Sequence, residues 1–217
     1  MDYEKARFNM VAQQIRTWDV LDQTVLDALS VVRREEFVPG AYRDLAFAEV
    51  EIPLGEGANM LAPMIEARLL QAARVKKTDH VLDVGTGSGY SAALLGAMAD
   101  KVVSVELSPV LAERARANLA RAGVQNVTVE VGDAARGWAQ RGPYDVIFVG
   151  GALPQLPDDF QEQLKPGGRL VVVVGKRPAM TLKCVTCQTH GVYQTENVIE
   201  TLVAPLANAA APKEFEF

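Results

Sequence analysis

The sequence predicts an α/β protein built on a doubly wound, seven-stranded and mostly parallel sheet. From residue 80 onward, short apolar segments of strand length alternate with segments of helical pattern. Such alternation is typical of parallel sheets that helices cover on both faces. A glycine-rich turn at residues 85–89 follows the first of these strands. Open parallel sheets bind ligands at this position, beyond the carboxyl end of the strand.

The first 78 residues differ from the rest because their pattern is mainly helical. A loop that holds Gly55 and Gly57 precedes the last of the expected helices. We therefore expect a single domain, in which a helical N-terminal cap (residues 1–78) packs on an α/β core (residues 79–217). Helices are expected at residues 3–17, 22–32 and 63–74.

The elements of the core follow from apolar runs and helix boundaries. Ser108 is a suitable N-cap with Pro109 at the first helical position, and Gly123 lies just beyond the helix that they begin. The last two strands meet near Gly191 and predict an antiparallel hairpin. Strands are expected at residues 80–85, 101–106, 127–131, 144–149, 169–174, 181–188 and 193–203, helices at 90–98, 109–122 and 157–164, and a turn at 166–168.

Composition excludes several classes of function. The chain has 22 basic and 27 acidic residues, a net charge of −5, so it lacks the basic surface that nucleic-acid binding requires. Its apolar runs are of strand length, far below the ~20 residues of a membrane span. The N-terminus has no signal-peptide pattern, and two cysteines make no disulfide framework. We expect a cytoplasmic protein that binds neither membranes nor nucleic acids.

The glycine turn and its neighbouring acid indicate which class of ligand the protein binds. It reads Asp83-Val-Gly85-Thr-Gly87-Ser-Gly89, which departs from the G-x-G-x-x-G spacing of dinucleotide-binding proteins. Asp83 stands two residues before the first glycine. A carboxylate there would repel a pyrophosphate but would suit an ammonium or sulfonium group.

Two more acids follow the next two strands. Glu106 lies 21 residues after Gly85 and suits a ribose diol, and Asp133 suits the exocyclic amine of adenine. Together with Asp83 they describe a nucleoside with a cationic tail, which is S-adenosylmethionine. The residues expected to bind it are Asp83, Gly85, Thr86, Gly87, Ser88, Gly89, Glu106, Leu107, Asp133 and Ala134.

Motifs along roughly residues 8 to 205 resemble the protein-L-isoaspartate O-methyltransferases, a family of class I S-adenosylmethionine-dependent methyltransferases. The resemblance implies a Rossmann-like fold and methyl transfer to the carboxylate of an isoaspartyl residue in damaged protein. It also implies Asp83, Gly85 and Gly87 at the methionine end of the cofactor, Glu106 at the ribose, and Asp133 with Ala134 at the adenine. The motifs are Met10-Val-x-x-Gln14-Ile-Arg16, Phe37-Val-Pro39, Ile52-Pro-Leu-Gly55, Val84-Gly-Thr-Gly-Ser-Gly-Tyr90, Val131-Gly-Asp133 and Leu164-Lys-Pro-Gly-Gly-Arg-Leu170.

One segment departs from the family. Where the family has Gly-x-Gly followed by Gln-Thr-Ile-Ser-Gln-Pro, this chain continues from Gly57 with Ala-Asn-Met-Leu-Ala-Pro63. Leu61 replaces the serine to which a catalytic role is usually assigned, and leucine has no hydrogen-bond donor. We assign no catalytic residue and expect Leu61 to make the acceptor pocket more apolar. The residues expected on the acceptor side are Asn59, Met60, Leu61 and Pro63.

Three alternatives to isoaspartyl methylation stay open. The acceptor could be a small metabolite or another carboxylate, or the chain could bind the cofactor without catalysis. A nucleotide-dependent dehydrogenase is disfavoured by the glycine spacing and Asp83. A metal site is not expected, because Cys184 and Cys187 have no second pair of ligands and lie three apart on a strand, facing opposite ways. The oligomeric state is not predicted.

Overall fold

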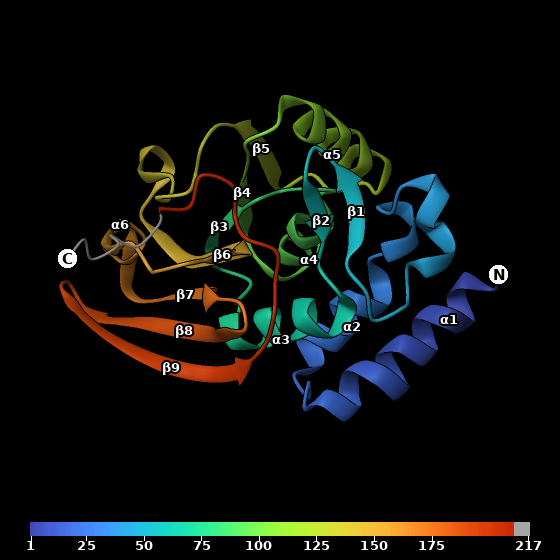
Figure 1. Cartoon of the computed structure of the whole chain (residues 1–217), viewed down its shortest axis with the longest axis horizontal. Coiled ribbons are helices and arrows are strands. Elements are labelled where there is room, and N and C mark those ends of the chain that lie inside the picture. Colours follow the sequence, from blue (N-terminus) through green and yellow to red (C-terminus); the bar gives the residue numbers. More distant parts are fainter. Residues whose placement is uncertain (211–217) are drawn as a thin grey trace.

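A seven-stranded sheet forms the centre of the molecule, in the strand order β5-β4-β3-β6-β7-β8-β9 (Figure 1). The computed structural model describes residues 1–210. Strands β3 to β7 are mutually parallel, β8 pairs antiparallel with β7, and β9 pairs antiparallel with β8. The predicted fold class is therefore confirmed. The strands are β3 (His80–Val84), β4 (Lys101–Glu106), β5 (Val127–Val131), β6 (Tyr144–Leu153), β7 (Leu164–Lys176), β8 (Ala179–Thr189) and β9 (Val192–Glu200).

The order of the strands determines where a ligand can bind. The chain passes from β3 outward to β4 and β5, and then returns to the other side of β3 to form β6. At this reversal the connections after β3 and β6 leave on opposite sides of the sheet, which opens a crevice beyond the carboxyl ends of the strands. The glycine turn at 85–89 lies at this point.

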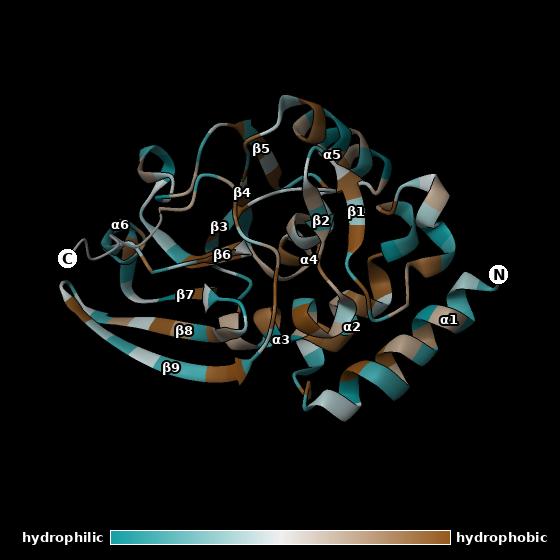
Figure 2. Ribbon diagram, in the orientation of Figure 1, coloured by the Kyte–Doolittle hydropathy of each residue, from teal (hydrophilic) through white to brown (hydrophobic). Residues whose placement is uncertain are grey.

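The two faces of the sheet are buried in separate hydrophobic clusters. On one face, α3 (Pro63–Ala73), α4 (Tyr90–Met98) and α5 (Pro109–Arg121) cover alternate strand residues such as Val102 and Val146. On the other face, Ile147 and its neighbours pack under α6 (Asp158–Glu162). Figure 2 shows apolar residues along the inner strands and polar ones along much of edge strand β9. The separation follows from the two-residue period of strands.

The N-terminal residues pack as the predicted helical cap on the α3–α4 side of the sheet (Figure 1). The helix expected at 3–17 divides into α1 (Tyr3–Asn9), a π-helical stretch (Met10–Ile15) and a 3-10 turn (Arg16–Trp18). It is followed by α2 (Gln23–Val31) and by 3-10 turns at Arg34–Glu36 and Gly40–Leu45. The last seven residues of the predicted 79–217 core lie outside the described residues.

Two predictions of local structure were wrong. The loop with Gly55 and Gly57 is a hairpin of β1 (Ile52–Gly55) and β2 (Ala58–Met60), and both glycines adopt positive φ at its turn. The turn expected at 166–168 lies within β7, because Leu164 already pairs with Tyr144 before the strand shifts register. The preceding helix, α6, is correspondingly short.

The hairpin of β8 and β9 extends the sheet as predicted. Its two cysteines are free and buried on opposite faces, Cys184 with the α3 side and Cys187 with the α6 side. Beyond β9, the chain runs back over the carboxyl end of β6, where Pro205 forms a bridge with Ala152. No helix within residues 1–210 is long and apolar enough to cross a membrane.

Candidate active site

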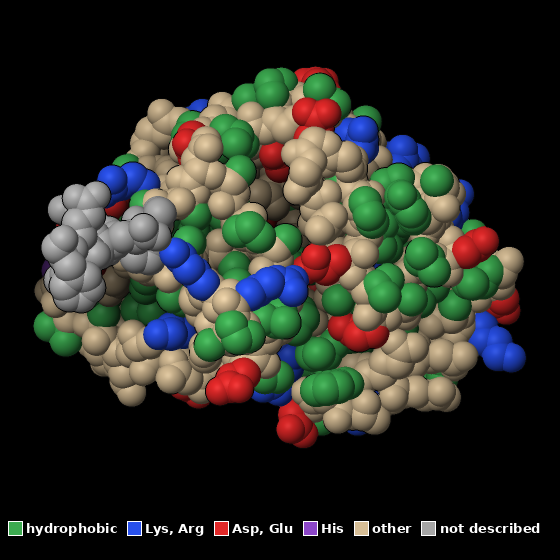
Figure 3. Space-filling view, in the orientation of Figure 1, with side chains coloured by type: hydrophobic (Ala, Val, Ile, Leu, Met, Phe, Trp, Pro, Cys, Tyr) green, Lys and Arg blue, Asp and Glu red, His purple; other side chains and the backbone are tan. Residues whose placement is uncertain are grey.

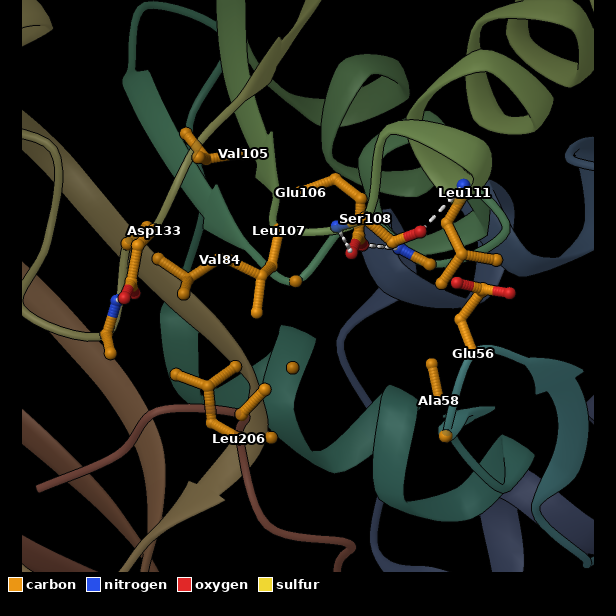
Figure 4. Close-up of a pocket in the computed structure, with 18 of the residues that line it drawn as sticks. Glu56, Ala58, Val84, Val105, Glu106, Leu107, Ser108, Leu111, Asp133 and Leu206 are labelled. Atoms are coloured by element: carbon orange, nitrogen blue, oxygen red, sulfur yellow. Dashed lines mark hydrogen bonds between the residues drawn. The ribbon is translucent and has the colours of Figure 1, made fainter.

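A cavity of about 340 Å³ opens beyond the carboxyl ends of β3, β4, β5 and β6. Its size is within the range of small-molecule sites. Figure 3 shows it as a hollow above the centre of the view, and Figure 4 shows its lining. Six groups of residues line it. Four come from the sheet: Val84, Gly85 and Gly87 at the end of β3; Val105 to Ser108 and Leu111 from the end of β4 into α5; Gly132 to Ala135 after β5; and Gly150 and Gly151 in β6. The other two are residues 56–59 and 204–207.

The glycine loop turns sharply because three of its residues adopt left-handed backbone angles. Gly85, Gly87 and Gly89 have φ values of 88°, 54° and 86°, which L side chains rarely adopt. Gly85 and Gly87 line the cavity, so their backbone is open to a ligand. Gly89 serves packing instead, since an added Cβ would lie 3.3 Å from Ala115 of α5.

Two loop side chains expected at the cofactor point away from the cavity. Thr86 and Ser88 are both buried and lie outside the lining. The Thr86 hydroxyl lies 2.6 Å from that of Ser104 in β4, and the Ser88 carbonyl accepts a hydrogen bond from Asn118. The Thr86 side chain therefore fixes the loop on the sheet, and the Ser88 backbone fixes it on α5.

Glu106 connects the glycine loop to α5. Its Oε2 accepts a hydrogen bond from the Gly87 backbone N–H at 2.8 Å, and its Oε1 accepts one from the Ser108 N–H at 3.0 Å (Figure 4). The carboxylate lines the cavity although the residue is only 6% exposed. Each carboxylate oxygen can accept a second hydrogen bond, so Glu106 can receive ligand hydroxyls while it holds the loop. Leu107, next in the chain, also lines the cavity.

Asp83 lies beneath the loop rather than in the cavity wall. It is fully buried, and its Oδ2 accepts a hydrogen bond from the Ser104 hydroxyl at 2.6 Å. Burial raises the pKa of Asp83 to about 7, although the Ser104 hydroxyl opposes this shift. The structure therefore places Asp83 behind the glycine backbone, not at the cavity surface where the sequence prediction put it.

Asp133 lies at the opposite end of the cavity from the β1–β2 hairpin (Figure 4), and Ala134, next in the chain, also lines the cavity. Asp133 Oδ1 accepts from the Ala135 N–H at 2.9 Å, and its Oδ2 accepts from Asn208 Nδ2 at 3.0 Å. The second bond ties the segment after β9 to this wall.

Sequence reasoning missed one wall altogether. Residues 204–207 line the cavity, and Leu206 lies against Gly151 of β6 so closely that an added Cβ would be 2.9 Å from the Leu206 Cα. The Leu206 N–H also donates to the Ala152 carbonyl. The paired glycines at 150–151 were the available signal, since two glycines at a strand end indicate close approach of another backbone.

The β1–β2 hairpin forms the remaining wall. Residues 56–59 line the cavity, and the Asn59 amide donates to Glu51 at 3.1 Å. Of the four residues expected on the acceptor side, only Asn59 lies in the lining. The other three, Met60, Leu61 and Pro63, are buried away from it.

Leu61 in particular is 6% exposed and packs in the hydrophobic cluster between cap and sheet. The expectation that its side chain makes the acceptor pocket apolar is therefore not supported. Within residues 1–210, no group of three His, Cys, Asp or Glu residues is arranged to hold a metal ion.

Comparisons with known proteins agree with this geometry. The family model for protein-L-isoaspartate (D-aspartate) O-methyltransferase matches residues 5–211. The chain belongs to this family. The predicted family, its class of S-adenosylmethionine-dependent methyltransferases and the predicted cofactor are thereby confirmed.

Individual relatives span most of the chain. The protein-L-isoaspartate O-methyltransferase of Methanoculleus marisnigri is 44% identical over 178 residues, 82% of this chain and 81% of the relative. That of Roseiflexus castenholzii is 37% identical over 211 residues, 97% and 96% of the two chains. A solved protein-L-isoaspartate O-methyltransferase superposes with a TM-score of 0.81 at 26% identity, covering 95% of this chain and 66% of that one.

A second solved structure shows the fold alone. It is a Plasmodium falciparum protein described as a putative protein-L-isoaspartate O-methyltransferase in complex with S-adenosyl-L-homocysteine. It superposes with a TM-score of 0.80 at 17% identity, and the match covers 95% of this chain and 98% of that one.

Proposed function

We propose that this protein methylates the free carboxylate of L-isoaspartyl residues in damaged proteins and peptides, with S-adenosylmethionine as the methyl donor. The observation that carries the proposal is one continuous cavity in a chain of this family. A glycine loop and two carboxylates line it at the sheet, and the β1–β2 hairpin lines its other side. Donor and acceptor can therefore meet inside a single site.

The described residues fit the donor. Glu106 would hold the ribose hydroxyls, and Asp133 with Ala134 would hold the adenine, whose amine can donate to a carboxylate. Gly85 and Gly87 would contact the methionine end through their exposed backbone. Asp83, buried behind this loop, acts on the same end through charge and not through direct contact.

The reaction places modest demands on the protein. S-adenosylmethionine supplies an activated methyl group on a sulfonium, and the transfer exchanges a carbon–sulfur bond for a carbon–oxygen bond to give a methyl ester. Because the acceptor carboxylate is already ionised at neutral pH, no side chain has to remove a proton. The protein contributes alignment of the two reactants and exclusion of water. This explains how a site without the family serine can still function.

A different carboxylate acceptor is the second candidate. It is favoured by the hairpin, where Asn59 is one of the cavity-lining residues and its amide is held by Glu51. This wall therefore differs chemically from the family pattern. Free small-molecule carboxylates are the acceptors that would compete with isoaspartyl peptides. We propose protein or peptide acceptors rather than nucleic acids, and a cytoplasmic location that suits two free thiols.

Methyl transfer from labelled donor tests the proposal. The acceptors are a peptide with one L-isoaspartyl residue and the same peptide with ordinary aspartate. We expect label in the isoaspartyl peptide alone, released by mild base as a methyl ester should be. Label in neither peptide, but in small acids of a cell lysate, would favour the second candidate.

A pair of variants identifies the site. Glu106→Ala removes a charged hydrogen-bond partner, worth ~1.5–3 kcal/mol, so donor affinity should fall about 10- to 100-fold. Glu113→Ala is the matched control, because Glu113 lies on the exposed side of α5 and, within residues 1–210, forms an ion pair with Arg116 alone. Equal donor affinity in both variants would contradict the assignment of Glu106.

A further inference from the structure

A layer of buried charged and polar side chains separates the cap from the sheet behind the cavity. Its members are Arg34, Glu66, Asp83 and Tyr90, and we call it the Arg34 layer. Arg34 has no exposed surface, and its guanidinium lies 4.9 Å from the centre of the Tyr90 ring. Glu66 of α3 is equally buried, with Oε2 3.9 Å from Arg34 Nη1.

Arg34 holds the end of the hairpin through its backbone. Its Nε donates to the Ala46 carbonyl at 2.7 Å, and its Nη2 donates to the Leu61 carbonyl at 2.5 Å. Leu61 immediately follows β2, the strand that carries the cavity-lining Ala58 and Asn59. The rigid planar guanidinium fixes both carbonyls together.

The same layer reaches the glycine loop. Tyr90 is the first residue of α4, directly after Gly89, and its ring faces Arg34. Asp83 is the penultimate residue of β3, just before the loop, and the nearby charge of Glu66 helps to raise its pKa. The Arg34 layer thus adjoins both walls of the cavity, the donor wall through Tyr90 next to the glycine loop and the acceptor wall through the Leu61 carbonyl next to β2.

The layer costs stability. Arg34 Nη1, both Glu66 carboxylate oxygens, Asp83 Oδ1 and the Tyr90 hydroxyl have no hydrogen-bond partner among the described residues. Burial also raises the pKa of Glu66. Replacing buried ion pairs by apolar residues is often neutral or stabilising, so packing alone does not explain this set. Buried polar atoms that lack partners and so lower stability are concentrated at functional sites.

We propose that Arg34 is a positioning residue of the methyl-transfer site, which holds the 58–61 segment in register with the glycine loop, and that Glu66 anchors it. This inference rests on the proposed function, because its kinetic test uses an isoaspartyl peptide as the substrate. Arg34 does not line the cavity, so it would contact neither the methyl donor nor the acceptor. It acts through the Leu61 carbonyl and the Tyr90 ring. A shift of this segment by about 1 Å would misalign the acceptor and cost roughly 100-fold in turnover.

The test compares Arg34→Met with Arg7→Met. Arg7 is the matched control because it is also a buried cap arginine, 6% exposed, and pairs with Glu35, and neither residue lines the cavity. Both variants should lose stability. Only Arg34→Met should lose about 100-fold in kcat on an isoaspartyl peptide, with the dissociation constant for the donor unchanged within about threefold.

Arg34→Lys separates charge from geometry. Lysine restores a cation opposite Glu66 but cannot donate in one plane to both Ala46 and Leu61. We expect it to recover much of the melting temperature and little of kcat. If Arg34→Met does not fold, Arg34→Lys against Arg7→Lys gives the same comparison. Equal kcat in the Arg34 and Arg7 variants would overturn the proposal.

A second measurement does not depend on the acceptor. Amide hydrogen exchange of residues 58–62 should be faster in Arg34→Met than in the parent chain and unchanged in Arg7→Met. If the parent chain fails to methylate isoaspartyl peptides, the proposed function fails, and this exchange comparison still decides the role of Arg34. Equal protection of the amides of residues 58–62 from exchange in the two variants would then refute the positioning role of Arg34.

Discussion

Leu61 shows that a departure from a family motif has to be interpreted through packing. Sequence reasoning placed its side chain in the acceptor pocket, whereas the structure buries it between cap and sheet. What Leu61 presents toward the functional machinery is its carbonyl, which Arg34 holds. A leucine supplies that carbonyl as well as a serine would.

This placement gives a prediction for Leu61→Ser. The change leaves a small cavity and a buried hydroxyl, so the free energy of unfolding should fall by ~2–4 kcal/mol. Turnover of isoaspartyl peptide should match that of Leu61→Ala, the control that makes a cavity without a hydroxyl. Steady-state kinetics and urea unfolding measure both quantities. A serine variant ten times faster than the alanine variant would show that the hydroxyl reaches the substrate.

Asp83 predicts a dependence of stability on pH. Its pKa is about 7 in the folded protein against an ordinary value near 4, so the folded state binds the extra proton between these limits. Stability should therefore decrease as pH rises from about 4 to about 7, by at most about 4 kcal/mol. Glu66, whose pKa is also raised, contributes in the same direction.

Asp83→Asn isolates this contribution. The amide keeps the shape of the side chain and does not titrate, so the variant should lose much less stability between pH 5 and pH 8 than the parent chain. Urea unfolding at a series of pH values gives the slope for each. Parallel slopes would contradict a buried titrating carboxyl at this position.

At the level of elements, the segment after β9 completes the cavity. It is fixed by the Leu206 N–H on Ala152 and by Asn208 on Asp133, and Gly151 leaves room for it. Gly151→Ala would place a Cβ 2.9 Å from the backbone of Leu206. Displacing the segment should weaken donor binding about tenfold, because overpacking of this kind costs ~1–3 kcal/mol.

Calorimetry with S-adenosylhomocysteine measures this effect. Gly40→Ala is the control, since an added Cβ there meets nothing within 4 Å. It should leave the dissociation constant unchanged. Undiminished affinity in Gly151→Ala would show that residues 204–207 do not contribute to the binding site.

Elements differ in how far the sequence predicts them. The glycine loop and Glu106 were predictable, because the donor wall is built from strand ends whose order follows from the alternation of helices and strands. Residues 204–207 and the Arg34 layer were not, since they depend on contacts such as Arg34 with Leu61, 27 residues apart, and Leu206 with Ala152. The periodicity of apolar residues does not predict which backbone carbonyl a buried arginine will donate to.

At the level of the whole molecule, the cavity couples ligand binding to folding. A ligand that binds the folded state alone at 100 times its dissociation constant adds about 2.7 kcal/mol. For a chain of this length we expect a rise of roughly 5–10 °C in melting temperature with S-adenosylmethionine or S-adenosylhomocysteine. NAD should give no shift, because the glycine loop lies beside acidic groups. A larger shift with NAD would restore the dehydrogenase alternative.

The opposite orientations of Cys184 and Cys187 determine how the chain responds to oxidants. Each thiol is buried against a backbone carbonyl on its own side of the sheet, at Ala72 and at Thr189. Burial raises the pKa of both, which keeps them in the unreactive protonated form. The sheet itself stands between the two sulfur atoms, so they cannot join without unfolding. The folded protein should tolerate peroxide that would cross-link a surface dithiol.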